Sequence, residues 1–84
     1  MNNFIYTVTQ LNNHAKSVLE NTIKNVWLRG EISSFKKYSS GHAYFILKDS
    51  SSEISCTIFN YSDSLNFENG INITVSGEVT IYST

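Results

Sequence analysis

The spacing of apolar residues changes once along this 84-residue chain, from a helical period to a strand period. Before residue 25, apolar side chains recur every three or four positions, and from residue 26 onward they alternate with polar ones. The first pattern is typical of an amphipathic helix and the second of strands with one buried face. The sequence therefore predicts a mainly β fold with an N-terminal α-helix.

The helix is predicted over residues 7–23. Thr7 followed by Gln10 fits a capping box, which would begin the helix at Thr7. One face of this helix carries an apolar stripe that comprises Val8, Leu11, Ala15, Val18, Leu19 and Ile23. We divide the chain into a helical segment, residues 1–24, and a β domain, residues 25–84, on which the helix packs.

Four strands are predicted, over residues 26–33, 42–48, 53–59 and 71–82. Gly30, within the first strand, suggests a bulge or a sharp coil. Inward residues of the second strand are expected to be Ala43, Phe45 and Leu47, and those of the third Ile54, Cys56 and Ile58. Residues 35–41 are expected to form a loop. Residues 60–69, with Leu65 and Phe67 embedded, are expected to form a short helix or plug.

Three meandering strands followed by a connected fourth are typical of a Greek-key barrel of the OB type, which has five strands. We expect the chain to stop before the last strand and to be part of a larger protein. Open edges of apolar strands invite pairing, so two copies of such a fragment could exchange strands and form a homodimer.

Charge is distributed unevenly although the net charge is only −1. Between residues 24 and 48 five basic residues face one acidic residue, Glu31, whereas from residue 49 onward there are five acidic residues and no Lys or Arg. This asymmetry can place a basic strip on one side of the fold. A single cysteine and the lack of a signal peptide or long apolar run indicate a soluble, cytoplasmic protein that does not enter a membrane.

Residues with catalytic potential form no recognisable constellation. His14 and His42 do not stand at metal-ligand spacing with Cys56, and the apolar neighbours of Cys56 favour a buried structural thiol. The four glycines are dispersed, which excludes a phosphate-binding loop, and the acids at Asp49 and Glu53 flank a turn. We predict no catalytic residue, metal site or cofactor in this chain.

The outward face of the first three strands combines aromatic and basic residues, as platforms for single-stranded nucleic acid do. The predicted contact residues are Trp27, Arg29, Phe35, Lys36, Lys37, Ser40, His42, Tyr44, Lys48 and Phe59. A structural alternative remains for several of them. Trp27 could cover the helix, Tyr44 and Phe59 could fill a second small core, and the lysines could be a solvated loop pair.

Two segments, residues 26–33 (VWLRGEIS) and 39–49 (SSGHAYFILKD), resemble the N-terminal domain of the exodeoxyribonuclease VII large subunit family. Residues 6–12 (YTVTQLN) and 70–82 look like the same family. The resemblance implies an OB-fold that binds single-stranded DNA and delivers it to a downstream nuclease domain working with several small subunits. It also implies that the catalytic residues of the parent enzyme lie outside this chain. Tyr38 stands where the family usually has a proline, which suggests a more mobile loop.

Two other functions fit the residues. An anticodon-binding barrel of an aminoacyl-tRNA synthetase would have similar strand motifs. A protein-interaction barrel would use the aromatic face to bind a partner subunit.

Overall fold

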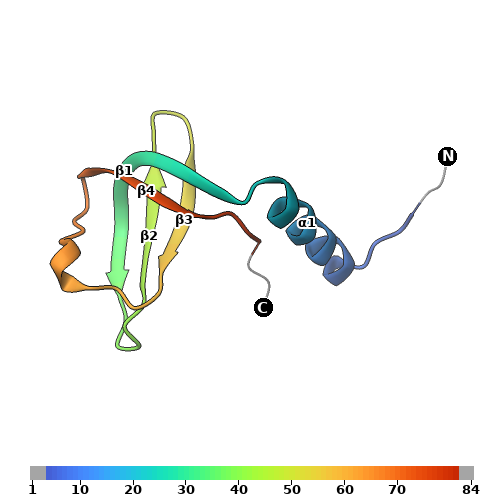
Figure 1. Ribbon diagram of the computed structural model, residues 1–84, viewed down its shortest axis with the longest axis horizontal. Coiled ribbons are helices and arrows are strands. Elements are labelled where there is room, and N and C mark those ends of the chain that lie inside the picture. Colours follow the sequence, from blue (N-terminus) through green and yellow to red (C-terminus); the bar gives the residue numbers. More distant parts are fainter. Residues whose placement is uncertain (1–3, 82–84) are drawn as a thin grey trace. The chain divides into compact units, whose positions relative to one another are not determined.

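A computed structural model of the protein describes residues 4–81 (Figure 1). Its elements, in chain order, are α1 (Val8–Thr22), β1 (Asn25–Lys37), β2 (Ala43–Lys48), β3 (Glu53–Ile58), the 3₁₀ helix η1 (Asp63–Leu65) and β4 (Asn72–Glu78). The chain divides into two compact units. The first contains the residues up to Trp27 and those from Ser76 onward, and the second is Leu28–Val75.

The helix α1 begins as its sequence predicts. The Gln10 backbone N–H donates to Thr7 Oγ1 at 3.0 Å, and the Thr7 backbone N–H donates to Gln10 Oε1 at 2.9 Å, which completes the capping box. No residue of α1 is buried, and Leu11 and Val18 are each about half exposed. Among residues 4–81, no helix has the length and apolar character that crossing a bilayer requires.

The four strands form one curled antiparallel sheet in the order β3-β2-β1-β4 (Figure 1). The fourth strand therefore lies beside the first and not beside the third, which is the spatial order of a Greek key. Two backbone hydrogen bonds, from the Ile32 N–H to the Ile71 carbonyl and from the Gly70 N–H to the Ile32 carbonyl, hold the segment before β4 beside β1. The predicted mainly β architecture with an N-terminal helix is confirmed, and the strand order agrees with the Greek key expected of an OB-type barrel.

The first strand is longer than predicted and carries its bulge elsewhere. It continues to Lys37, so the predicted loop over residues 35–41 is wrong for its first three residues. The pairing register with β2 shifts between Ser33 and Lys36, where Ser34 has a φ of 54°. A bulge inserts one residue and so exchanges the two faces of the strand. Ile32 points inward before the bulge and Phe35 points inward after it.

Gly30 is buried and lies where β1 closely approaches the end of β2. A Cβ atom at this position would lie 2.7 Å from the Lys48 carbonyl oxygen and 3.0 Å from Leu47 Cγ. Because one of these neighbours is backbone, it cannot rotate away. The glycine predicted to mark a bulge thus serves a close strand-to-strand approach instead.

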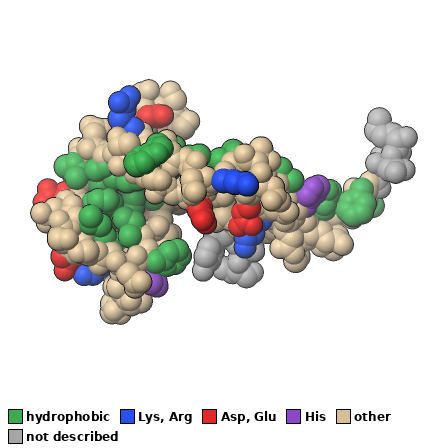
Figure 2. Space-filling model, viewed as in Figure 1, with side chains coloured by type: hydrophobic (Ala, Val, Ile, Leu, Met, Phe, Trp, Pro, Cys, Tyr) green, Lys and Arg blue, Asp and Glu red, His purple; other side chains and the backbone are tan. Residues whose placement is uncertain are grey.

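The core lies within the second unit. Its buried residues are Ile32, Ala43, Phe45, Leu47 and Tyr61, and the side chains packed around its centre are Leu28, Phe35, Cys56, Ile58, Phe67, Ile73 and Val75. The predicted inward face of β2 is confirmed. Ile54 pairs with the inward Leu47 and so lies on the predicted face of β3, but it is 43% exposed near the start of this edge strand. Apolar side chains are also visible in clusters at the surface of this unit (Figure 2).

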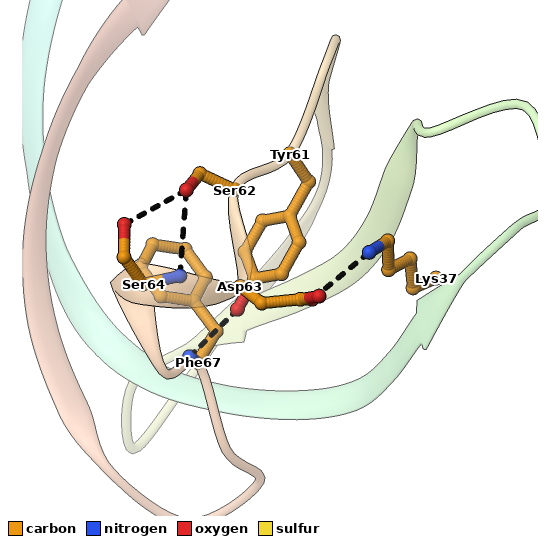
Figure 3. A network of polar contacts seen from close by, with 6 residues as sticks. All are labelled: Lys37, Tyr61, Ser62, Asp63, Ser64 and Phe67. Carbon is orange, nitrogen blue, oxygen red and sulfur yellow. Dashed lines mark hydrogen bonds and ion pairs between the residues drawn. The ribbon is translucent and has the colours of Figure 1, made fainter.

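The connection between β3 and β4 contains the predicted short helix, η1, and joins it to the core (Figure 3). Tyr61 Oη accepts a hydrogen bond of 2.9 Å from the Phe67 backbone N–H. The Phe67 ring packs edge-on against Phe45, with 5.6 Å between centroids, and the Tyr61 ring packs against Phe35 at 5.2 Å. Four aromatic rings, two from the connection and one each from β1 and β2, therefore hold this connection on the sheet.

Candidate nucleic-acid interface

The outer face of the sheet is the side of β1, β2 and β3 that points away from the core. Strand pairing arranges it in three rows: Lys36–Tyr44–Thr57, Ser33–Ile46–Ser55 and Glu31–Lys48–Glu53. Tyr44 and Lys48 are exposed, as the alternation of β2 predicts. The rows place an aromatic ring beside a lysine at one end of the face and a mixed set of charges at the other.

A shallow hollow opens at the aromatic end of the outer face. It is lined by Tyr38, Ser39, Ser40 and Tyr44. The two tyrosine rings lie edge to face, with 5.1 Å between centroids and 83° between planes, and Lys36 Nζ lies 5.1 Å from the Tyr38 ring centroid. We call these five residues the two-tyrosine hollow. Tyr38 was not among the predicted contact residues, although its place directly after two lysines could have suggested it.

The hairpin loop that carries Tyr38 is closed by two backbone hydrogen bonds. The Tyr38 N–H donates to the His42 carbonyl and the Gly41 N–H donates to the Tyr38 carbonyl, each at 2.9 Å. Gly41 has a φ of 93°, which an L-residue rarely adopts. A proline at position 38 has no N–H and could not form the first bond. Greater mobility of the loop with tyrosine stays a prediction.

His42 and Phe59 form a second ring pair at the ends of β2 and β3. Their centroids lie 5.1 Å apart with planes at 86°, and Phe59 is 66% exposed. His42 Nδ1 accepts a hydrogen bond of 3.2 Å from the Asn60 backbone N–H, which leaves Nε2 as the nitrogen free to donate. Both predicted residues therefore lie near the surface, and Phe59 does not enter a core.

The remaining predicted contact residues divide between the two faces. Arg29 and Lys48 are exposed, and Lys48 Nζ lies 3.8 Å from Glu31 Oε2. Lys37 instead forms an ion pair of 2.9 Å with Asp63 (Figure 3). Phe35 packs on the core, so its predicted place on the outward face is wrong. The physical reason is the bulge, which turns Phe35 inward.

Trp27 lies at the end of the first unit and is 76% exposed. Its indole is therefore not enclosed by a core. Trp27, Tyr44 and Phe59 all keep a large share of their surface exposed, which stacking on a base requires.

Comparison with known proteins decides the family. A model of the family described as OB-fold nucleic acid binding domain matches residues 6–84. The chain belongs to this OB-fold family.

Relatives of this OB-fold domain are found among bacterial nuclease subunits. Proteins named exodeoxyribonuclease 7 large subunit are 43% identical in Shewanella denitrificans over 83 residues and 46% identical in Clostridium novyi over 80 residues. These matches cover 95% and 89% of this chain but only 19% and 20% of the relatives. The resemblance to the exodeoxyribonuclease VII large subunit is thus confirmed, and the chain spans about a fifth of the length of these proteins.

Cys56 is the one cysteine of the chain, and it packs against the core and not on the outer face. Burial raises the pKa of the Cys56 thiol, which keeps it protonated and poorly nucleophilic. Within residues 4–81, no three His, Cys, Asp or Glu side chains gather as they would around a metal ion. What the outer face offers is aromatic surface, hydroxyl groups and the cations at Arg29, Lys36 and Lys48.

Proposed function

We propose that this OB-fold domain binds single-stranded DNA across the outer face of β1–β3. The observation that carries the proposal is the two-tyrosine hollow, in which Lys36 and the exposed rings of Tyr38 and Tyr44 lie within about one nucleotide of each other. Stacking of a base on an aromatic ring contributes about 1–3 kcal/mol and tolerates every base. The lysine supplies the positive charge that a phosphate needs.

Few cations take part, and the chain as a whole is slightly acidic. Electrostatic attraction to the phosphate backbone therefore comes from a small number of local contacts. We expect weak binding with a shallow salt dependence, to which stacking contributes a large share. Affinity would then come from the rings and orientation from Arg29, Lys36 and Lys48.

The longer protein is proposed to be a nuclease subunit, because the relatives are named exodeoxyribonuclease 7 large subunit. In this proposal the OB-fold domain delivers single-stranded DNA to a part of the protein outside this chain, which hydrolyses it to oligonucleotides. Small subunits would bind that other part, and the enzyme would act in the cytoplasm. No residue of this chain is assigned to the hydrolysis.

The ring of Tyr44 gives the first test. Tyr44→Ala removes the stacking surface, and we expect a loss of about 1–3 kcal/mol of binding free energy, measured by fluorescence anisotropy with a labelled oligonucleotide. Thr57→Ala is the matched control, because Thr57 is the neighbour of Tyr44 across β2 and β3 on the same face but carries no ring. Equal affinity of the Tyr44→Ala variant and the unmodified chain would contradict the proposal.

The two adjacent lysines give the second test. Lys36→Ala should lower the slope of log affinity against log salt concentration by about 1, because one phosphate contact is lost. Lys37→Ala should change it less, because Asp63 already neutralises the Lys37 ammonium. A preference for an anticodon stem-loop would favour the synthetase alternative. Tight binding of a protein with a flat salt response would favour the interaction barrel.

A further inference from the structure

We infer that the two-tyrosine hollow turns two successive bases of a bound strand apart, and therefore selects weakly stacked, pyrimidine-rich single strands over adenine tracts. This inference rests on the proposed function and names the class of DNA that the same site prefers. It follows from the angle between the rings and from the groups around them.

The ring planes of Tyr38 and Tyr44 cross at 83° while their centroids are only 5.1 Å apart. Successive stacked bases are parallel and about 3.4 Å apart. A strand whose bases remain stacked can therefore lie flat on one of these rings but not on both. To contact both rings, the strand must turn between two neighbouring nucleotides and break the stack at that step.

Polar groups at the hollow suit a strand that turns. Ser39 and Ser40 line the hollow together with the two rings, and their hydroxyl groups can donate to a phosphate or a base edge. Lys36 Nζ lies 5.1 Å from the Tyr38 centroid, so a cation stands beside the site of the turn. Where the strand turns between the two rings, the phosphate that links the two nucleotides would lie near the Lys36 ammonium and the serine hydroxyl groups.

The backbone that carries the Tyr38 ring is held by hydrogen bonds of the hairpin. Its N–H and its carbonyl both take part in the bonds that close the hairpin, and Gly41 completes the turn. On the other side, the Tyr44 backbone is paired with Lys36 and Thr57 in the adjacent strands. Both rings thus extend from a bonded backbone and contact each other edge to face in this structure, so we expect the strand to adapt to the corner.

Adaptation costs the stacking free energy of one step. This cost is larger for adenine than for thymine, and differences in stacking and backbone flexibility are the usual source of base preference at such sites. We expect oligo-dT to bind about tenfold more tightly than oligo-dA of equal length, which corresponds to the difference between a strongly and a weakly stacked step.

The decisive experiment compares three forms of the 84-residue chain: unmodified, Tyr38→Ala and Tyr38→Phe. Anisotropy titrations with oligo-dT and oligo-dA give the affinity ratio for each form. A second probe, an oligo-dT with two adjacent 2-aminopurines, fluoresces more strongly when these two bases unstack. Circular dichroism melts check that each variant is folded, which the 44% exposure of Tyr38 leads us to expect.

We expect the unmodified chain and Tyr38→Phe to favour oligo-dT and to raise the 2-aminopurine signal at saturation. Tyr38→Ala should still bind through Tyr44, but with similar affinities for both oligonucleotides and without the fluorescence rise. Binding with no rise in the unmodified chain, or a ratio unaffected by Tyr38→Ala, would overturn the inference while leaving the proposed function intact. No binding of either oligonucleotide would overturn both.

Discussion

The two faces of β2 differ strongly in their exposure to solvent. On the inner face, Ala43, Phe45 and Leu47 are between 0% and 4% exposed. On the outer face, Tyr44 is 43% exposed and Lys48 lies in solvent beside Glu31. Successive residues of β2 therefore belong alternately to the core and to the candidate interface.

This difference shows how a small domain can carry a binding surface whose residues are separate from those of its core. The rings of the outer face are positioned by strand pairing, which depends on backbone bonds and on the residues of the inner face. Substitutions on the inner face should thus change stability and, through unfolding, everything else. Substitutions on the outer face should change binding alone.

The largest effect is expected from Phe45→Ala. The ring is 4% exposed and packs edge-on against Phe67, so its removal leaves a cavity as well as losing burial. We expect the free energy of unfolding to fall by about 3–5 kcal/mol, measured by urea denaturation followed by circular dichroism. A domain of this size can lose its folded state altogether with such a change.

The neighbouring variant Tyr44→Ala is the control for that comparison. Its ring is on the outer face, and we expect a change in the free energy of unfolding within about 0.5 kcal/mol. Similar destabilisation by both substitutions would mean that the outer face is also part of the core, and the separation of the two faces would be wrong.

The regular parts of this architecture could be predicted from the sequence. In β2 the alternation of Ala43, Phe45 and Leu47 with Tyr44, Ile46 and Lys48 predicts an inner face, and the three predicted inward residues are the buried ones. The capping box at Thr7 is equally local, because the two partners are three residues apart. Patterns of this kind depend only on the period of the backbone.

The bulge in β1 could not be predicted, and the misplaced residues follow from it. It lies between Ser33 and Lys36, in a stretch without glycine, and it exchanges the inward and outward positions. Phe35 and Lys37 were expected beside Lys36 on the outer face, but Phe35 packs on the core and Lys37 pairs with Asp63. Only tertiary contacts decide where an extra residue is accommodated.

Tyr61 was missed for a related reason. It lies in a polar stretch without any periodic spacing of apolar residues. Its burial comes from contacts with Phe35 and Phe67, which cannot be predicted from the sequence. The pairing of Tyr38 with Tyr44 across the hairpin also depends on the loop geometry. The sequence thus indicated an aromatic and basic outer face but not the arrangement of its rings.

A medium effect is expected from Tyr61→Phe, which sharpens the contrast between an inward and an outward tyrosine. The substitution keeps the ring but removes the oxygen that accepts the Phe67 N–H. We expect a loss of about 1 kcal/mol in the free energy of unfolding, with DNA affinity unchanged. Tyr44→Phe, the corresponding change on the outer face, should leave stability unaltered. A clear loss of DNA binding by Tyr61→Phe would show that the two faces are not independent.

The smallest effect concerns the turn that joins β2 to β3 and belongs to neither face. Asp49 Oδ1 accepts hydrogen bonds of 2.9 Å from the backbone N–H groups of Ser51 and Ser52, and these bonds hold the pKa of the carboxyl below its usual value of 3.8. A carboxyl whose pKa is lower in the folded state stabilises that state above its unfolded pKa, and the contribution is lost as pH falls through the folded value. Asp49→Asn should therefore be less stable than the unmodified chain near neutral pH, and the difference should shrink as the pH falls below about 3.8.

Urea denaturation midpoints of the two forms at a series of pH values measure this difference. Ser51→Ala is the control, because it keeps both the carboxylate and the backbone N–H that Asp49 binds. Its difference from the unmodified chain should stay constant across the series. If the difference in midpoint between Asp49→Asn and the unmodified chain were also constant with pH, the Asp49 carboxylate would not stabilise the turn. The turn would then be held only by the hydrogen bond from the Asp49 N–H to the Ser52 carbonyl. The hairpin that aligns Tyr44 with Thr57 would then depend on its backbone and its inner face, with no contribution from the charge at its tip.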